Sequence, residues 1–189
     1  MKAILYRPPA GAVLEDVPVP ALKDGEVLIS VDASGLCGSD LLKLNASAEG
    51  ILGHEVAGRV AKMGARVKGF QIGDRVVAAH HVPCFECHFC LRGNPSMCRQ
   101  FRSSNFDPGG FSEFIRLSEG HVRHTLLKIP ASLDSLSASF TEPLACVVRN
   151  VKRLKLVPGD AVGIVGLGSI GLLTGQLLRH LKISVLGFD

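Results

Sequence analysis

Short apolar runs separated by turn residues make up most of the first 129 residues. The runs at residues 26–31, 56–60 and 75–79 are rich in valine and other apolar side chains, and each predicts a strand. Glycines punctuate this part of the chain at short intervals, at positions 53, 58, 64, 69 and 73. Such spacing is typical of a compact β-barrel-like domain with tight corners, in which long helices are few.

The pattern changes after Pro130. Residues 135–156 repeat apolar side chains with helical spacing, interrupted early by Pro143, and residues 157–160 predict a turn. A buried-strand run at 161–165 leads into a glycine-rich turn, an apolar helix that reaches residue 181, and a second strand at 184–188. This order predicts a β-α-β unit. We therefore expect a mixed fold, with a β-barrel-type domain over residues 1–150 and the beginning of a nucleotide-binding α/β domain over residues 151–189.

The turn between the last two strands carries the pattern G-x-G-x-x-G. Gly166 permits a tight turn, Gly168 lets the backbone approach a pyrophosphate, and Gly171 lets the helix lie close to the strand. Asp189 follows at about the 20-residue separation of an acid that binds the adenosine ribose, so NAD is favoured over NADP. The alternative is a glycine-rich turn in an unrelated α/β fold. The residues expected to contact the dinucleotide are Gly166, Gly168, Ser169, Ile170, Gly171 and Asp189.

Composition narrows the functional classes. The chain has 189 residues, 47% of them hydrophobic, and a formal net charge of +4 from scattered Lys and Arg. Because no basic stripe with interleaved aromatic side chains occurs, we expect no nucleic-acid partner. The first residues hold no apolar targeting segment, and the most apolar stretch, residues 161–178, is broken by glycines. We therefore expect a cytoplasmic protein with no membrane partner, whose thiols bind metal rather than form disulfides.

Four cysteines form a tight cluster in the sequence, spaced C-x2-C-x2-C-x7-C, at Cys84, Cys87, Cys90 and Cys98. This spacing lets one short lobe surround a single ion with four thiolate sulfurs. A tetrahedral shell of four sulfurs suits Zn2+ and leaves no open position for a substrate, so we interpret it as a structural zinc site.

A second candidate metal site combines a thiol, an imidazole and a carboxylate. Cys37 lies in the segment G-L-C-G-S-D, and His54 and Glu55 follow Gly53. Taken alone, Cys37 is more often a small buried residue, and His54 a core histidine. All three side chains are nevertheless good Zn2+ ligands.

The motifs together resemble those of the zinc-dependent medium-chain alcohol and polyol dehydrogenases. The block Gly53-His54-Glu55-x2-Gly58-x5-Gly64-x2-Val67 matches the signature of that family, and the four-cysteine cluster matches its structural zinc lobe. The order of motifs along the whole chain also matches. The segment Glu142-Pro143-Leu144-Ala145 is similar to the sorbitol and threonine dehydrogenase branch. The resemblance implies an N-terminal GroES-like catalytic domain followed by the start of a Rossmann domain.

The resemblance also implies roles for individual residues. Cys37 and His54 would be ligands of a catalytic zinc, with Glu55 close by. Glu142 matches the remaining ligand position, bound directly or through water, and Cys146 is the alternative thiolate, one helical turn further on.

Other residues would act around this ion. Asp40 would orient His54, as carboxylate partners do for ligating imidazoles. Ser39 would pass the substrate proton outward. His80, His81 and His88 are expected at the surface or in the cysteine lobe, because four sulfurs already complete that zinc site.

The function implied is reversible hydride transfer between an alcohol or polyol and NAD, with two Zn2+ per chain. The alternatives are amino-alcohol oxidation of the threonine dehydrogenase type and a non-catalytic zinc-binding fragment. The resemblance further implies a homodimer or homotetramer in the full-length form. Members of the family are nearly twice this length, so we expect the 189 residues by themselves to bind NAD weakly and to turn over little substrate.

Overall fold

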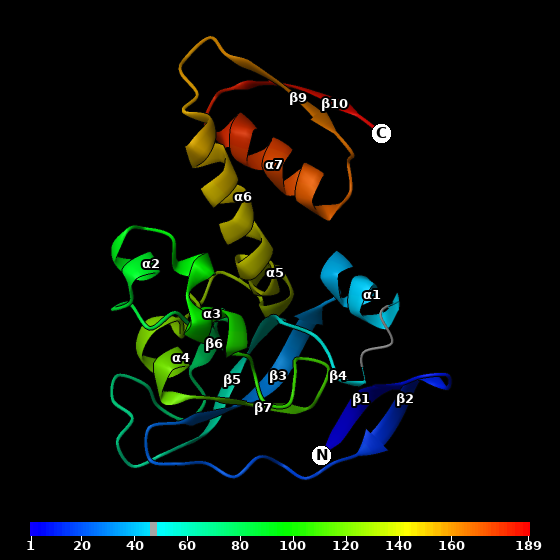
Figure 1. The fold of residues 1–189 in the computed structure, drawn as a ribbon, viewed down its shortest axis with the longest axis vertical. Helices are drawn as coiled ribbons and strands as arrows, with labels where there is room; N and C mark the ends of the chain where they lie inside the picture. Colours follow the sequence, from blue (N-terminus) through cyan, green and yellow to red (C-terminus); the bar gives the residue numbers. More distant parts are fainter. Residues whose placement is uncertain (46–48) are drawn as a thin grey trace. The chain divides into compact units, whose positions relative to one another are not determined.

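The computed structural model describes residues 1–45 and 49–189, which divide into two compact units, Met1–Phe140 and Thr141–Asp189 (Figure 1). The first unit is built on antiparallel sheets with short helices, and the second is a β-α-β unit preceded by a helix. The mixed fold predicted from the sequence is therefore confirmed. The boundary expected at residue 150 falls inside α6 (Thr141–Leu154), the first helix of the second unit, whose Val147 and Val151 belong to the core of that unit.

A five-stranded sheet organises the first unit. Its strand order is β7-β3-β5-β6-β8, and every neighbouring pair is antiparallel. The strands are β3 (Val27–Gly35), β5 (Glu55–Met63), β6 (Arg75–Val77), β7 (Phe114–Leu117) and β8 (Leu127–Lys128). The long central pair, β3 and β5, contains two of the runs predicted from sequence and extends each of them by several residues.

Apolar side chains from these strands form the core of the unit. Val27 and Ile29 of β3, Val60 of β5 and Leu117 of β7 are all almost fully buried, and Phe106 from the loop before β7 joins them. Because side chains alternate between the faces of a strand, the residues at positions 27 and 29 lie on the same face. The alternation therefore directs one face of the sheet into the core.

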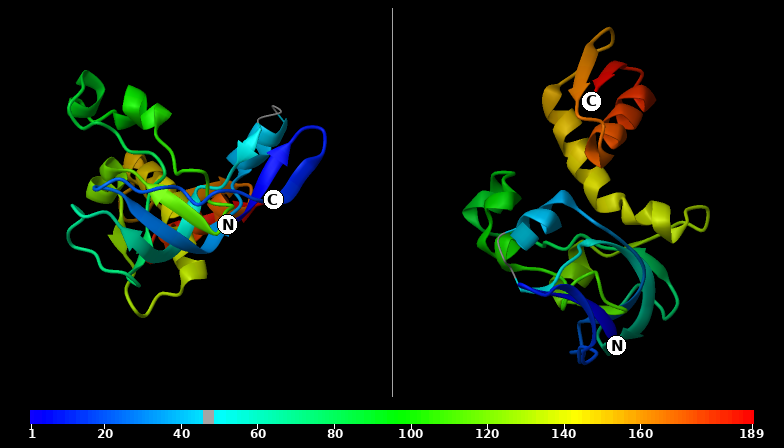
Figure 2. Two further views of the ribbon diagram at one scale, coloured as in Figure 1. Left: turned by 90° about the horizontal axis from the view of Figure 1, so that it is seen from below. Right: turned by 90° about the vertical axis from the view of Figure 1, so that its right-hand side faces the viewer.

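A hairpin and several short helices complete the first unit. The strands β1 (Lys2–Arg7) and β2 (Gly11–Asp16) pair with each other, and β1 also pairs with β4 (Gly50–Ile51). The helices are α1 (Gly38–Asn45), α2 (His88–Leu91), η1 (Pro95–Met97), α3 (Arg99–Ser103), α4 (Glu119–His124) and α5 (Ser135–Ser139). The segment with α2 and α3, drawn in green, stands away from the sheets in the left panel of Figure 2.

Gly58 shows how closely β3 and β5 approach each other. A Cβ atom at this position would lie 2.2 Å from the Ser30 carbonyl oxygen and 2.7 Å from Ile29 Cγ2. Substitution with alanine would therefore force backbone apart in the centre of the sheet. We expect Gly58→Ala to lower the free energy of unfolding by about 3 kcal/mol, measured by urea denaturation.

Gly38→Ala is the matched control for this substitution, because a Cβ at Gly38 meets no atom within 4 Å. We expect it to change the free energy of unfolding by no more than about 0.5 kcal/mol. Equal effects of the two substitutions would contradict the close approach of β3 and β5.

The second unit has the order α6, β9 (Ala161–Val165), α7 (Ser169–His180) and β10 (Ser184–Phe188). The two strands are parallel, in register from Ser184 opposite Ala161 to Phe188 opposite Val165. Ile164 of β9 and Leu178 of α7 are buried together with Val147 and Val151 of α6. The predicted β-α-β unit is thus present, and α6 contributes to its core.

The segment 135–156, predicted to be helical, forms two helices, α5 and α6. They are separated at Phe140 rather than at Pro143. Pro143 lies in the first turn of α6, where a missing N–H removes no intrahelical hydrogen bond. Among the residues that the structure describes, no helix is both long enough and apolar enough to cross a bilayer.

Candidate functional site

The register of β3 and β5 brings Cys37 and His54 together. Gly35, the last residue of β3, pairs with Glu55, the first residue of β5. Cys37 follows two residues after one member of this pair, and His54 directly precedes the other. Antiparallel pairing therefore places two ligand types that are far apart in the sequence at one end of the sheet.

Glycines make room for the polar side chains at this end of the sheet. A Cβ at Gly35 would lie 2.1 Å from a carboxylate oxygen of Glu55, so a larger residue there would displace that carboxylate from its present position. Gly53 has a φ of +91°, and a Cβ there would lie 2.8 Å from the Phe111 backbone nitrogen. The glycine of the Gly53-His54-Glu55 motif is thus required by its left-handed backbone conformation as well as by the close approach.

Cys37, His54 and Glu55 form a group whose potential ligand atoms all lie within 4.8 Å of one another. His54 and Glu55 are 5% and 7% exposed, and Cys37 is half-buried. A thiolate and a carboxylate this close would repel each other, and their burial makes a charge without a partner costly. The set therefore fits a divalent cation between the three side chains, and Zn2+ accepts all three ligand types.

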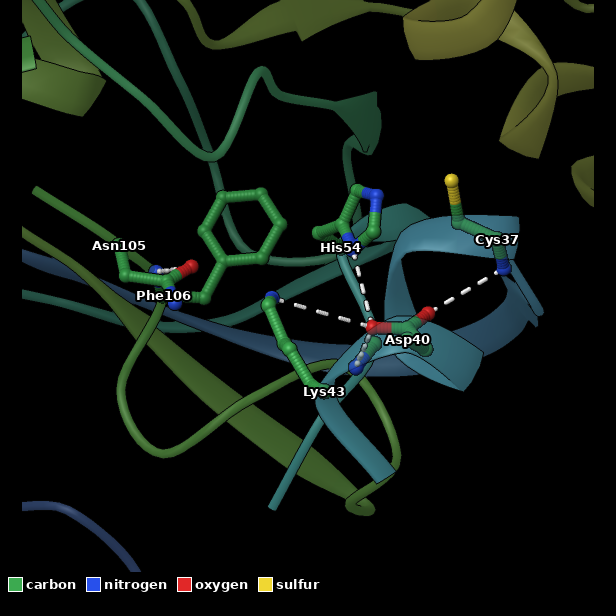
Figure 3. Close-up of polar contacts among 7 residues, drawn as sticks. Cys37, Asp40, Lys43, His54, Asn105 and Phe106 are labelled. Carbon is green, nitrogen blue, oxygen red and sulfur yellow. Dashed lines mark hydrogen bonds and ion pairs between the residues drawn. The ribbon is translucent and has the colours of Figure 1, made fainter. Parts of the chain in front are cut away.

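Asp40 connects this group to the start of α1. Its Oδ2 accepts a hydrogen bond from the Cys37 backbone N–H at 3.2 Å, and its Oδ1 accepts one from the Gly53 N–H at 3.4 Å (Figure 3). The first of these bonds is the backward arm of a capping box, in which the third helical residue reaches the residue before the helix. The Asp40 carboxylate is fully buried.

The same carboxylate faces His54. His54 Nδ1 lies 3.4 Å from Asp40 Oδ1. This is an electrostatic contact, because its geometry does not meet the criteria of a hydrogen bond. Figure 3 shows the Cys37 sulfur and the His54 ring on the same side of Asp40. A carboxylate at Nδ1 directs the imidazole and leaves the other ring nitrogen, Nε2, as the ligand atom.

His80 lies beside this site, although the sequence predicts it at the surface or in the cysteine lobe. Its ring centroid lies 4.5 Å from that of His54 and 3.9 Å from that of His81. Burial, followed by the charge of His81, lowers the pKa of His80 to about 3, so the ring is neutral at physiological pH. Val77 pairs with Ala57 in the antiparallel ladder between β6 and β5. His80 lies three residues after Val77 and His54 three residues before Ala57, so the two histidines face each other, and this register would have predicted their contact.

The four-cysteine cluster forms the second group of potential metal ligands. The sulfur atoms of Cys84, Cys87, Cys90 and Cys98 all lie within 4.8 Å of one another. Cys84 and Cys98 are separated by 3.6 Å between sulfurs, as are Cys87 and Cys90. Phe85 turns the chain between the first two cysteines in a left-handed conformation, with φ of 62°.

The environment of these thiols favours an ion at their centre. The backbone N–H of Cys84 donates to the Cys98 sulfur and lowers the pKa of that thiol to about 6. Burial raises the pKa of the Cys90 thiol to about 12. Four thiols packed this closely cannot all ionise without a cation, and four thiolates around Zn2+ make a closed structural site.

The glycine turn of the second unit has the geometry that its sequence predicts. Gly166 has a φ of +93°, and a Cβ at Gly171 would lie 2.0 Å from the Gly166 carbonyl oxygen. Gly168 caps α7, and a Cβ there would meet no atom within 4 Å. Ser169 and Ile170 begin the helix and are exposed. The turn therefore leaves open space beside the N-terminus of a helix, which favours binding of an anionic phosphate.

Asp189 lies beside this turn. Its Oδ1 accepts a hydrogen bond from the Leu167 backbone N–H at 2.9 Å, and the Gly166 N–H donates to the Phe188 carbonyl at 2.8 Å. The acid expected to bind a ribose is therefore held against the glycine turn, while the side chain stays exposed.

Three further predicted residues have defined places but no described part in a site. Ser39 lies half-buried in the first turn of α1, two residues after Cys37. Glu142 lies in the first turn of α6, in the second unit, and its Oε1 is 3.8 Å from the sulfur of Cys146. The catalytic roles of Ser39 and Glu142 stay predictions.

Comparisons with known proteins agree with these features. The family model of the alcohol dehydrogenase GroES-like domain matches residues 23–131. Sorbitol dehydrogenase from Bombyx mori is 35% identical over an alignment of 181 positions that covers 90% of this chain and 51% of that protein. L-threonine 3-dehydrogenase from Bacillus velezensis is 34% identical, over 92% of this chain and 52% of that protein. The chain thus spans about half the length of the curated relatives it matches.

Solved structures give the same result. A protein of Sinorhizobium meliloti 1021 solved bound to NADP has a TM-score of 0.86 and 30% identity, over 98% of this chain and 55% of that chain. Acetophenone reductase from Geotrichum candidum in complex with NAD has a TM-score of 0.86 and 27% identity, over 100% of this chain and 57% of that chain. Similar folds therefore carry either dinucleotide.

Proposed function

The chain belongs to the family defined by the alcohol dehydrogenase GroES-like domain, and on this premise we propose that it is a zinc-dependent oxidoreductase that transfers a hydride between an alcohol or polyol and NAD. The observation that carries the proposal is the group formed by Cys37, His54 and Glu55, whose ligand atoms lie within 4.8 Å of one another. The reaction would convert an alcohol and NAD+ into a carbonyl compound, NADH and a proton.

Two zinc ions would be held by residues of this chain. Cys37, His54 and Glu55 would bind the catalytic ion, with Glu142 at the remaining position, and the four-cysteine cluster would bind the structural ion. When bound, zinc would supply a Lewis acid and NAD a hydride acceptor.

The chain's own residues position these groups. Asp40 faces the Nδ1 edge of His54 and accepts a hydrogen bond from the Cys37 backbone N–H. We assign to Ser39 Oγ the transfer of the substrate proton toward solvent, the role that the family resemblance implies for this residue in the first turn of α1. The glycine turn of Gly166, Gly168 and Gly171 would hold the pyrophosphate, and Asp189 the adenosine ribose.

Elemental analysis and an alcohol scan test this proposal. The protein should contain two zinc ions per chain, and the full-length gene product should form NADH from polyols such as sorbitol. One zinc ion per chain together with no NADH from any alcohol would overturn the proposal in favour of a non-catalytic zinc-binding module.

Amino-alcohol oxidation is the second candidate, favoured by the 34% identity to an L-threonine 3-dehydrogenase. The same scan separates the two candidates, because L-threonine would then give NADH faster than sorbitol does. Cytoplasmic location and a homo-oligomeric full-length form remain proposals. The six cysteines, all without a disulfide, support the first of these.

Asp189 should decide between NAD and NADP. Its carboxylate can accept hydrogen bonds from a ribose diol but would repel a 2′-phosphate. We expect Asp189→Asn to weaken NADH binding about tenfold and to improve NADPH binding relative to NADH, measured by fluorescence titration. Asp189→Glu keeps the charge and should retain the preference for NADH. Equal binding of NADH and NADPH by the unsubstituted protein would contradict this role.

A further inference from the structure

Lys43 provides a positive charge beside the candidate metal site that no motif of the family assigns. Its Nζ lies 4.0 Å from Asp40 Oδ1, the oxygen that also faces His54 Nδ1 at 3.4 Å (Figure 3). Lys43 is the third residue after Asp40 on α1, so the two side chains lie on the same face of the helix. The lysine is 45% exposed, whereas the aspartate is 0% exposed.

Asp40 is a buried carboxylate that accepts two backbone hydrogen bonds and faces two basic side chains. The carboxylate borders a cavity of about 350 Å³ whose other walls are apolar and include Leu36, Leu41, Leu44 and Leu52. Electrostatic interactions are stronger in such surroundings than in water, and a buried charge without a partner is costly. Within the part of the chain that the structure describes, the ion-pair contacts of Asp40 are to Lys43 and to His54.

The charge of Lys43 also lies close to a proposed metal ligand. Its Nζ is 4.0 Å from Asp40 Oδ1, and the same oxygen is 3.4 Å from His54 Nδ1. A cation that binds among Cys37, His54 and Glu55 would therefore enter a region near the lysine charge.

We propose that Lys43 is a positioning residue that acts as the counter-charge of Asp40 in the metal-free protein and lowers the affinity of the Cys37–His54–Glu55 site for Zn2+. The inference rests on the proposed function, since it requires a metal at that site. Two effects of Lys43 both lower the affinity of the site for Zn2+. Lys43 repels the incoming ion directly, and it stabilises the metal-free state, in which Asp40 would otherwise lack a cation.

Lys43→Met therefore should bind zinc more tightly. The test is competition between the protein and a chromophoric chelator for Zn2+, with Cys37→Ser measured in parallel to identify the equivalent that belongs to the Cys37 site. We expect an about fivefold lower Kd at that site for Lys43→Met, and a smaller ratio at high salt, because the lysine is partly exposed. The metal-free variant should also unfold at a lower temperature.

Two control variants make the test specific to charge. Lys43→Arg keeps the charge and should retain the Kd of the unsubstituted protein. Lys68→Met removes an exposed lysine of the same unit and should also leave the Kd unchanged. In the Asp40→Asn background, the part of the effect of Lys43→Met that acts through the carboxylate should disappear, while the part due to direct repulsion between the lysine and the ion should persist.

The outcomes separate this inference from the proposed function. Two zinc ions per chain with an unchanged or higher Kd in Lys43→Met would overturn the role of Lys43 alone. A single zinc ion in the unsubstituted protein, retained in Cys37→Ser, would overturn the metal site and the role of Lys43 together.

Discussion

Replacing Cys37 with serine is expected to remove one of two zinc ions per chain and to abolish hydride transfer. A serine hydroxyl is a far poorer zinc ligand than a thiolate, because it is not ionised near neutral pH. We expect the rate of NADH formation to fall at least about a thousandfold, equivalent to about 4 kcal/mol of transition-state stabilisation. Elemental analysis gives the zinc content, and absorbance of NADH gives the rate in the full-length gene product.

Cys146→Ser is the matched control, since Cys146 is the other cysteine outside the four-cysteine cluster and is exposed. It should retain both zinc ions and, in the full-length gene product, the rate. If Cys146→Ser lost a zinc ion while Cys37→Ser kept both, the thiolate ligand would be Cys146, and the assignment of Cys37 would be wrong.

The second large effect is expected at the four-cysteine cluster. Cys84 lies 3.6 Å from Cys98 and 4.0 Å from Cys90 between sulfurs, and its sulfur also accepts the Cys87 backbone N–H at 3.3 Å. Cys84→Ser therefore removes one ligand and a hydrogen-bond acceptor for the lobe. Because structural zinc contributes directly to folding, we expect the thermal midpoint to fall by about 10 °C.

A chelator separates loss of metal from loss of packing in this experiment. Treatment with chelator should lower the midpoint of the unsubstituted protein close to that of Cys84→Ser, and it should lower the midpoint of Cys84→Ser much less. An unsubstituted protein whose midpoint is insensitive to prolonged chelation would contradict a structural metal at these cysteines.

The fold could largely be predicted from local patterns. The runs at 161–165 and 184–188 coincide with β9 and β10, because these strands belong to a single β-α-β unit with a simple local pattern. In the first unit the runs at 26–31 and 56–60 predict β3 and β5 but are too short, and the run at 75–79 is longer than β6, which ends at Val77. The structure extends the run at 56–60 to Glu55–Met63, since pairing with β3 continues past the apolar core. Pro143 predicts an interruption of the helix, but it lies in the first turn of α6, which accommodates proline.

The site was predicted less completely than the fold. The ligand types at Cys37, His54 and Glu55 are visible as a motif, and the structure brings them together. The contact of His80 with His54 depends on which residues of β5 and β6 face each other, and a single sequence does not give that register. The pairing of Lys43 with Asp40 depends on the burial of Asp40, which the sequence does not show, because an exposed lysine on a helix is common.

The capping arrangement at the start of α1 couples local folding to ion occupancy. Asp40 accepts the Cys37 N–H that precedes the helix and the Gly53 N–H before His54, so one carboxylate joins two loops. By thermodynamic linkage, an ion that favours this geometry must also slow amide hydrogen exchange in the first turn of the helix. Protection of that turn thus becomes a structural reporter of occupancy that is independent of turnover.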